Sequence, residues 1–287
     1  MHPTLFQVGA FQVGTHDVFT LLALGVGLAL YYRELHRRRI LDPVITWISL
    51  AVVVGGAIGA RLIMAWDHLD YYATYLGTMP LSWVIEHSGK SIIGGIAGGY
   101  LAGVVAKRAL GYTRSTGDCY ALAIAVATAI GRVGCFLSEL PLGTPTDLPW
   151  GVTVPAEAAA TFPYCPGCDL PMHPSHIYEI LFNVVAAVAI VRYGRRVPVP
   201  GDLLKLYLLA AVTFRFVVEF VRGSPVTAFG LTSPQLVLIP LGVMLAWHFA
   251  WQVRRRAWAV PPAPPAALAS AAAPTAAPAL RVREVQP

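Results

Sequence analysis

Charged residues are scarce in this 287-residue chain: Asp, Glu, Lys and Arg together account for 13% of the sequence, whereas hydrophobic residues account for 56%. The apolar residues occur in blocks rather than in amphipathic stripes, and the blocks are about twenty residues long, which is the length that crosses a bilayer as a helix. This composition excludes an ordinary soluble domain. It predicts an all-α, polytopic integral membrane protein.

Two other features are missing from the sequence. No basic region precedes the first apolar block, so we expect no cleaved signal peptide at the N-terminus. The chain also contains no GxGxxG motif, phosphate loop or serine-triad pattern. It therefore lacks the usual sequence patterns of nucleotide-binding and serine-hydrolase sites.

Seven apolar blocks are candidates for membrane-spanning helices. The third block, SIIGGIAGGYLAGVVA, is the shortest and the richest in glycine, so it is either a tightly packed span or a re-entrant segment. Residues 257–287 are Ala/Pro-rich low-complexity sequence that cannot form a packed core. We therefore predict a seven-span domain over 1–256 and a disordered cytoplasmic tail over 257–287. The predicted spans are residues 17–34, 43–66, 91–106, 118–136, 174–191, 203–221 and 234–253.

The connections between the predicted spans alternate in charge: Lys and Arg are frequent in one set and almost absent from the other. Residues 136–173 contain neither. The positive-inside rule then predicts a periplasmic N-terminus and a cytoplasmic C-terminus. The net charge of +6 follows from this topology, so we expect no nucleic-acid partner. The basic connections contain Arg33, Arg37, Arg38 and Arg39; Lys107, Arg108 and Arg114; Arg192, Arg195, Arg196 and Lys205; and Arg254, Arg255 and Arg256.

Five cations are not explained by topology, because they lie inside or at the start of a predicted span. An arginine in the hydrocarbon region costs about 2.5 to 3.5 kcal/mol on insertion scales, so such residues usually face the bundle interior and have partners or ligands. The predicted orientation places the arginines of spans four and six toward the outer leaflet. The five cations are Arg61, Lys90, Arg132, Arg215 and Arg222.

Three predicted helices carry polar stripes at a similar depth, formed by residues three or four positions apart. One interpretation is a set of structural ion pairs, for example Arg132 with Glu219. The other is a site for an anionic phospholipid headgroup, because a guanidinium stays charged and binds phosphate oxygens through two parallel donors. The stripes are Thr128, Arg132 and Cys135; His176, Glu179 and Asn183; and Arg215, Glu219 and Arg222.

Several segments, taken in order, resemble the bacterial prolipoprotein diacylglyceryl transferase family. GRVGCFLSELPLG (131–143) resembles the family signature, a Gly-Arg-x-Gly-Asn-Phe run that ends in a Glu and a Gly. DLPWG (147–151), HPSHIYE (173–179) and RFVVEFVR (215–222) match further family segments, as do GARL (59–62) and GKSIIGG (89–95). The resemblance covers spans two to seven and agrees with a seven-span, N-out topology.

The resemblance implies an enzyme of the bacterial cytoplasmic membrane that uses no cofactor. Its partners would be phosphatidylglycerol, a membrane lipid, and prolipoprotein signal peptides with a lipobox cysteine. The diacylglyceryl group would move to the cysteine thiol, with release of glycerol phosphate. Arg132 and Arg215 would stabilise the leaving phosphate, and Glu139, Glu219 and His176 are candidates for the base that the thiol requires.

The substrate-binding residues that we expect include two further arginines. Arg222 would orient the headgroup or hold Glu219, and Arg61 would do the same, although a structural role is favoured for Arg61. Packing is favoured over headgroup contact for the glycines of the third span. The full expected set is Arg61, Lys90, Ser91, Gly94, Gly95, Cys135, Gly143, His176, Tyr178 and Arg222.

Four departures from the family pattern keep a second interpretation open. Cys135 stands where the signature has Asn, the family's Gly-Glu pair is displaced to Glu139-Leu140, and Ile93 stands where the family has His. THDVF (15–19) replaces an aromatic Tyr-Gly. The alternative is a non-catalytic phospholipid-binding or lipid-translocating protein that kept the arginine pocket.

The stretch CPGCDLPMHPSH (165–176) contains cysteines and histidines, but their spacing fits no strong zinc signature. A disulfide between Cys165 and Cys168 competes with metal binding in an oxidising compartment, so we expect no metal site. Cys119 and Cys135 lie in or beside a span, where cysteine is most often a small apolar residue.

Overall fold

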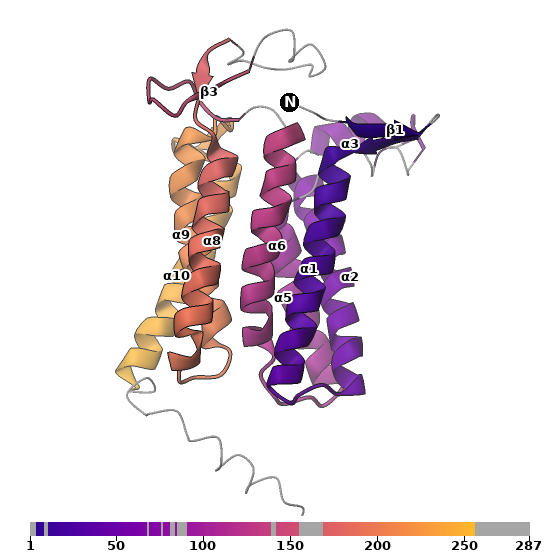
Figure 1. The fold of residues 1–287 in the computed structure, drawn as a ribbon, viewed down its shortest axis with the longest axis vertical. Helices are drawn as coiled ribbons and strands as arrows, with labels where there is room; N and C mark the ends of the chain where they lie inside the picture. The colour runs from indigo at the N-terminus through magenta and orange to yellow at the C-terminus, as the bar shows by residue number, and fades with distance from the viewer. Residues whose placement is uncertain are drawn as a thin grey trace, which may run out of the picture.

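The computed structural model describes residues 4–8, 11–67, 69–75, 77–80, 84, 91–138, 142–154 and 169–255. Within these ranges, long helices run side by side to form one bundle (Figure 1). Each predicted span overlaps one of them, so the helical assignment of all seven blocks is confirmed. The long helices are α1 (Thr15–Arg37), α2 (Pro43–Asp67), α5 (Ile92–Ala109), α6 (Gly117–Ser138), α8 (Ser175–Tyr193), α9 (Asp202–Val218) and α10 (Ser233–Arg254).

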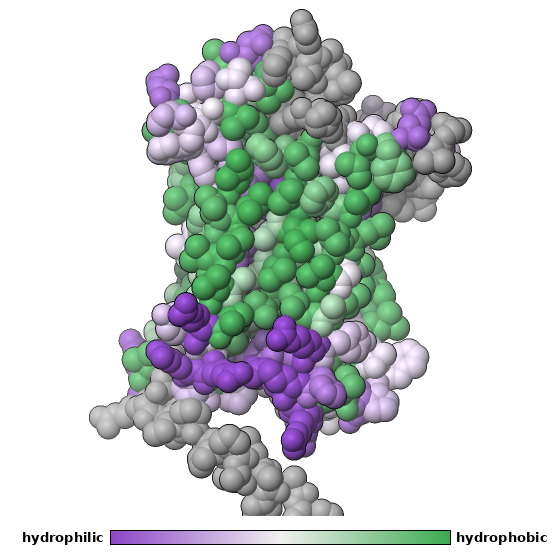
Figure 2. Space-filling view, viewed as in Figure 1, coloured by the Kyte–Doolittle hydropathy of each residue, from purple (hydrophilic) through white to green (hydrophobic). Residues whose placement is uncertain are grey.

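The long helices have the composition of membrane-spanning segments. Five of them, α1, α2, α6, α8 and α10, are long and apolar enough to cross a membrane. Large apolar side chains such as Leu21, Trp47 and Leu101 point outward and are about two-thirds exposed. Figure 2 shows a hydrophobic belt across the middle of the face in view. Because a soluble protein rarely exposes so large an apolar surface, the belt faces lipid, and the chain is a multi-pass membrane protein.

Basic residues gather at one end of the bundle, below the hydrophobic belt in Figure 2. They lie in the last turns of four helices: Arg37 in α1, Lys107 and Arg108 in α5, Arg192 in α8 and Arg254 in α10. We call this the basic end. The opposite end carries the start of α1 and the loop after α6 (Figure 1).

Short strands add to the all-α architecture that we predicted. β1 (Thr4–Val8) pairs with β2 (Phe11–Gly14), β3 (Val152–Thr153) with β4 (Pro171–Met172), and β5 (Val226–Ala228) with β6 (Leu231–Thr232), all antiparallel. In the third hairpin Phe229 and Gly230 both have positive φ, the backbone of a tight two-residue turn. Strands of two to five residues are too short to show an alternating pattern, which is why the sequence did not reveal them. Shorter elements are α3 (Leu69–Tyr75), η1 (Gly194–Arg196) and η2 (Glu219–Val221).

Helices α2 and α5 are in direct backbone contact along a face of glycines. A Cβ on Gly98 would collide with the carbonyl of Gly55 and lie 2.8 Å from the Cα of Gly59, and a Cβ on Gly94 would collide with the carbonyl of Gly59. The packing interpretation of this glycine-rich helix is therefore confirmed. The closest contacts are at Gly94 and Gly98, rather than in the more conspicuous series Gly95, Gly99 and Gly103.

Gly98→Ala is therefore expected to destabilise the protein by about 1 to 3 kcal/mol, because the added methyl group forces two tightly packed backbones apart. The measurement is thermal unfolding of the purified protein in detergent. Gly25→Ala is the matched control, since a Cβ at Gly25 of α1 meets nothing within 4 Å. Equal melting temperatures for the two variants would show that α2 and α5 can separate at no cost.

A second close approach joins α1 to α6. A Cβ on Gly134 would lie 2.6 Å from the Cβ of Phe19 and 3.6 Å from the Cα of His16, and a Cβ on Gly27 would lie 3.2 Å from that of Ala127. On its other side α6 packs against α8 and α9. Helix α6 thus connects the N-terminal helices to the C-terminal ones, and Gly134 draws the start of α1 onto the end of α6.

Toward the basic end, Asp118 ties α6 to α9 and α1. Its carboxylate accepts hydrogen bonds from the backbone N–H groups of Gly201 (2.9 Å) and Leu203 (3.1 Å) at the start of α9, and it lies 3.5 Å from Arg38 Nη1. A carboxylate at a helix N-terminus satisfies backbone donors that have no partner within the helix. These contacts fix one end of the bundle, so that the polar residues of α6, α8 and α9 meet near the other.

Candidate functional site: an arginine cluster between α6, α8 and α9

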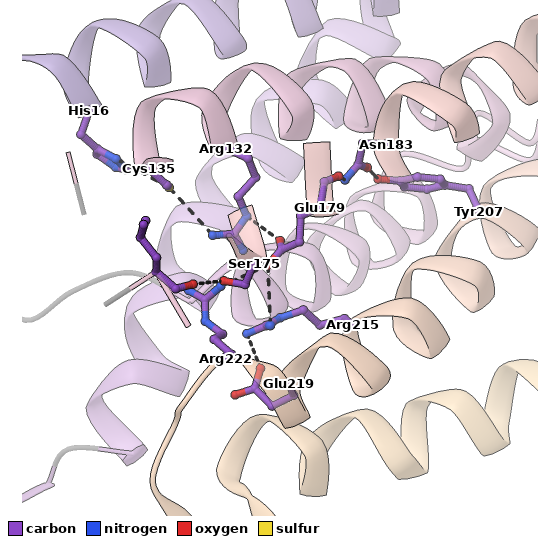
Figure 3. A network of polar contacts seen from close by, with 11 residues as sticks. His16, Arg132, Cys135, Ser175, Glu179, Asn183, Tyr207, Arg215, Glu219 and Arg222 are labelled. Carbon is purple, nitrogen blue, oxygen red and sulfur yellow. Dashed lines mark hydrogen bonds and ion pairs between the residues drawn. The ribbon is translucent and has the colours of Figure 1, made fainter. Parts of the chain in front are cut away.

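The centre of the candidate site is an ion pair between Arg132 of α6 and Glu179 of α8. Arg132 Nε lies 2.6 Å from Glu179 Oε2, and both residues are buried, with exposed fractions of 7% and 5%. Figure 3 shows the two side chains reaching toward each other across the helix interface. The partner of Arg132 in this pair is therefore Glu179, whereas the sequence analysis offered Glu219 as an example.

Two further arginines converge on the same carboxylate. Arg222 Nη1 lies 3.1 Å from Glu179 Oε1, and Arg215 Nη1 lies 3.6 Å from it (Figure 3). Arg215 also pairs with Glu219 one turn later, at 2.6 Å between Nη2 and Oε2. Arg222 thus holds Glu179, where we expected either the headgroup or Glu219. The three polar stripes do meet, as predicted, and Glu179 is the residue that joins them.

The cluster gathers several buried charges. Among the described residues, three guanidinium groups, of Arg132, Arg215 and Arg222, face two carboxylates, of Glu179 and Glu219. Glu219 is 1% exposed and Glu179 is 5% exposed, so water does little to screen these charges. Several guanidinium groups gathered in such a place favour binding of an anion.

A hydrogen-bonded chain supports the cluster from the membrane interior. Asn183 Nδ2 donates to the backbone carbonyl of Glu179 (2.8 Å), and Tyr207 of α9 donates its hydroxyl to Asn183 Oδ1 (2.8 Å). The sequence analysis missed Tyr207. Its position eight residues before Arg215, which places both on one face of α9, is the pattern that could have revealed it.

Cys135 and His16 extend the cluster toward the C-terminal end of α6. Cys135 Sγ lies 3.8 Å from Arg132 Nη1 and 3.9 Å from His16 Nδ1 (Figure 3). Cys135 was expected among the binding residues, and its place beside Arg132 agrees with the stripe predicted for α6. His16 was missed, because α1 has no polar stripe to mark it.

A cavity of about 90 Å³ borders the cluster and is lined by Arg132, Glu179 and Arg215 together with apolar residues of α9 and α10. A larger cavity, of about 480 Å³, lies between α1, α2, α5, α6 and α9 and has a mostly apolar lining. Both cavities touch Ile96 of α5 and Leu208 of α9. The cavity beside the arginine cluster and the larger apolar cavity thus adjoin each other, as the headgroup and the acyl chains of a phospholipid would require.

The remaining candidates on α2 and α5 have structural contacts. Ser91 accepts a hydrogen bond from the N–H of Gly94 (3.2 Å) and so caps α5. Gly94 packs against Gly59, while Gly95 lines the large cavity. Arg61 is half-buried on α2, next to Ala60, whose carbonyl accepts from the backbone N–H of Ser91 (3.1 Å).

Other candidates lie in or near the loop that follows α6. Tyr178 OH accepts a hydrogen bond from Trp150 Nε1 (2.9 Å) and lies 3.1 Å from His173 Nδ1, so its hydroxyl faces this loop. Gly143 lies against the carbonyls of His173 and Val221, where a side chain would not fit.

His176 is almost fully buried on α8, three residues before Glu179. Lys90, Glu139, Cys165, Cys168 and the predicted tail over 257–287 lie outside the described residues.

Comparison with known proteins places this arrangement in a family. The model of the prolipoprotein diacylglyceryl transferase family matches residues 3–251, which include every long helix described above except the last three residues of α10. The chain belongs to this family. The resemblance carried by the GRVGCFLSELPLG segment is thus confirmed, and the match contains all the residues of the arginine cluster.

Curated members of the family cover nearly the same length. The chain is 30% identical over 275 residues to a phosphatidylglycerol–prolipoprotein diacylglyceryl transferase of Pseudomonas putida, covering 90% of this chain and 97% of the relative. A protein of the same name from Azotobacter vinelandii is 29% identical over 274 residues, covering 89% and 96% of the two chains. One from Pseudomonas entomophila is 29% identical over 261 residues, covering 85% and 92%.

Proposed function

We propose that this chain transfers the diacylglyceryl group of phosphatidylglycerol to the cysteine thiol of a prolipoprotein, with release of glycerol phosphate. The family match supports this reaction, as do the full-length relatives that carry its name. The observation that carries the proposal is the cluster of three arginines around Glu179. Its three guanidinium groups suit an anionic phosphodiester.

Arg132 and Arg215 would act on the phosphate. Negative charge builds up on the leaving glycerol phosphate as its bond to the diacylglyceryl carbon breaks, and guanidinium groups already fixed in a water-poor site stabilise that charge. Arg222 would hold Glu179 and orient the headgroup. The adjoining apolar cavity of about 480 Å³ has space and a lining suited to acyl chains.

The proposed topology has seven membrane spans, a periplasmic N-terminus and a cytoplasmic C-terminus, in the bacterial cytoplasmic membrane. The concentration of basic residues at one end of the bundle supports this orientation. The arginine cluster then lies toward the outer leaflet, on the side where the signal peptide of a secreted preprotein emerges. The acceptor would be the lipobox cysteine of such a peptide.

A reporter fused after Val253, at the end of α10, is expected to be active only in the cytoplasm. A second reporter inserted after Thr146, in the loop that follows α6, is expected to be active only in the periplasm. Alkaline phosphatase and a green fluorescent protein make a suitable pair, because the first requires export and the second fails to fluoresce when exported through the general secretory pathway. The opposite pattern at both sites would reverse the proposed orientation.

The alternative is a protein that binds or translocates phospholipid without chemistry, and the observation that favours it is the replacement of the family's Asn and His by Cys135 and Ile93. The deciding experiment incubates purified protein with phosphatidylglycerol and a lipobox peptide, and mass spectrometry follows the peptide. We expect a diacylglyceryl adduct on the cysteine. A peptide with serine in place of that cysteine is the control, and lipid binding without any adduct would support the alternative.

A further inference from the structure

The chemistry of the proposed reaction requires a proton acceptor beside the incoming thiol, because the thiolate is the nucleophile. Two of the buried carboxylates are poor candidates for this role. Glu179 lies within 3.6 Å of three guanidinium groups, and Glu219 is 2.6 Å from Arg215. Both carboxylates are thus already engaged by guanidinium groups. Glu139 lies outside the described residues, and His176 is almost fully buried on α8. Among the described residues, we therefore look for the base at the margin of the cluster.

His16 stands at this margin. It is the second residue of α1, is half-buried, and directs Nδ1 toward Cys135 Sγ at 3.9 Å (Figure 3). The same sulfur lies 3.8 Å from Arg132 Nη1. The structure thus holds a thiol between an imidazole and the central arginine of the cluster.

The contact depends on the packing of α1 on α6. Gly134 has no side chain, so Phe19 and the backbone of His16 approach α6 closely at the turn that carries Cys135. Any larger residue at position 134 would push His16 away from the sulfur. The absence of a side chain at Gly134, next to Cys135, thus allows α1 to bring His16 close to the sulfur.

We propose that His16 is the base that accepts the proton of the acceptor thiol. The inference rests on the proposed function. The thiol of Cys135 marks a position from which a sulfur reaches both the imidazole and Arg132, and an acceptor thiol that attacks a lipid held by Arg132 comes within range of the same Nδ1. For Nδ1 to accept a proton, the neutral ring carries its own proton on Nε2.

The proton of the acceptor S–H moves to His16 Nδ1, and the imidazole becomes an imidazolium. The thiolate sulfur forms a bond to the glyceryl carbon, and the bond from that carbon to the phosphate oxygen breaks. The electron pair leaves with glycerol phosphate beside Arg132 and Arg215. His16 is half-exposed and can then return the proton to solvent.

The test compares three forms of the full-length protein in phosphatidylglycerol-containing nanodiscs: wild type, His16→Asn and His36→Asn. Asparagine keeps a hydrogen-bonding group near the position of Nδ1 but cannot take up the proton. His36 is exposed in the last turn of α1, at the basic end, and provides the matched control. Monodisperse elution confirms folding, and His16→Gln replaces His16→Asn if the latter aggregates.

The first readout does not depend on transfer. Methyl methanethiolsulfonate modifies thiolates, and peptide mass spectrometry gives its rates at Cys135 and at Cys119, a buried cysteine near the basic end. We expect Cys135 to react about tenfold faster than Cys119 in wild type and in His36→Asn, and to lose this advantage in His16→Asn. Equal rates at the two cysteines in wild type, or an advantage that survives His16→Asn, would overturn the pairing.

The second readout is transfer to the lipobox peptide, which we expect His16→Asn to slow by about 100- to 10,000-fold, as for loss of a general base. Full transfer by His16→Asn would overturn the catalytic role, and a loss confined to Glu139→Gln would give that role to Glu139. If wild type transfers nothing, the proposed function fails, and Cys135 reactivity still decides whether His16 accepts thiol protons.

Discussion

Arg132→Lys is expected to leave the protein folded and inserted and to lower its rate of diacylglyceryl transfer by about 100- to 1,000-fold, the loss typical of removing one preorganised donor. The guanidinium presents Nε to Glu179 at 2.6 Å while Nη1 points to Cys135 Sγ. A lysine side chain has a single charged nitrogen, so it cannot contact the Glu179 carboxylate and a second group near Cys135 at the same time. If it pairs with Glu179, its contact with the phosphate is lost.

The measurement is the initial rate of adduct formation on the lipobox peptide, with elution profile and thermal stability as folding checks. Arg108→Lys, an exposed arginine at the basic end, is the matched control and should transfer normally. An Arg132→Lys protein with full activity, together with an Arg132→Ala protein that unfolds, would show that this arginine has only a structural role.

Glu179→Gln is expected to be the most destabilising single change in the cluster, at about 3 to 5 kcal/mol, because a buried ion pair loses one partner. Glu179 faces Arg132, Arg222 and Arg215, so its loss removes the carboxylate that these three guanidinium groups share. Glu219→Gln removes the counter-ion of Arg215 alone and should cost less. Thermal unfolding in a neutral detergent gives both values.

Added phosphatidylglycerol provides a second test that the arginine cluster is organised around Glu179. A ligand that binds the folded state stabilises it, and an anionic headgroup replaces part of the charge that Glu179→Gln removes. Added phosphatidylglycerol should therefore raise the melting temperature of Glu179→Gln more than that of wild type, whereas phosphatidylcholine should not distinguish them. Equal destabilisation by Glu179→Gln and Glu219→Gln, without lipid rescue, would show that the cluster is not organised around Glu179.

The predicted polar stripes were a sound guide to the site because helical spacing is a local property. Arg215 and Glu219 lie four residues apart, and the structure pairs them one turn apart, Arg215 in the last turn of α9 and Glu219 at the start of η2, which follows directly. The sequence could not identify the partner of Arg132. Both Glu179 and Glu219 lie on stripes at a suitable depth, and the choice between them depends on α8 packing directly against α6.

Contacts between distant segments were beyond sequence reasoning. His16 belongs to a helix with no polar face, and the alignment of Tyr207 with Arg215 on α9 does not reveal that Tyr207 bonds to Asn183. Each contacts a residue distant in the chain: His16 contacts Cys135, and Tyr207 donates a hydrogen bond to Asn183. The glycine register was also hidden, because Gly94 and Gly98 are no more conspicuous in the sequence than Gly95 and Gly99.

The sequence by itself determined the membrane-protein class, the positions of the long helices and the residues that form the polar stripes, because hydropathy and helical periodicity are read within a single segment. The tertiary structure decided which stripes meet, that three arginines share Glu179, and that a histidine from α1 reaches Cys135. Those relations depend on how closely α6 approaches α8 on one side and α1 on the other. Such distances are set by small residues such as Gly134 and by the packing of the whole bundle.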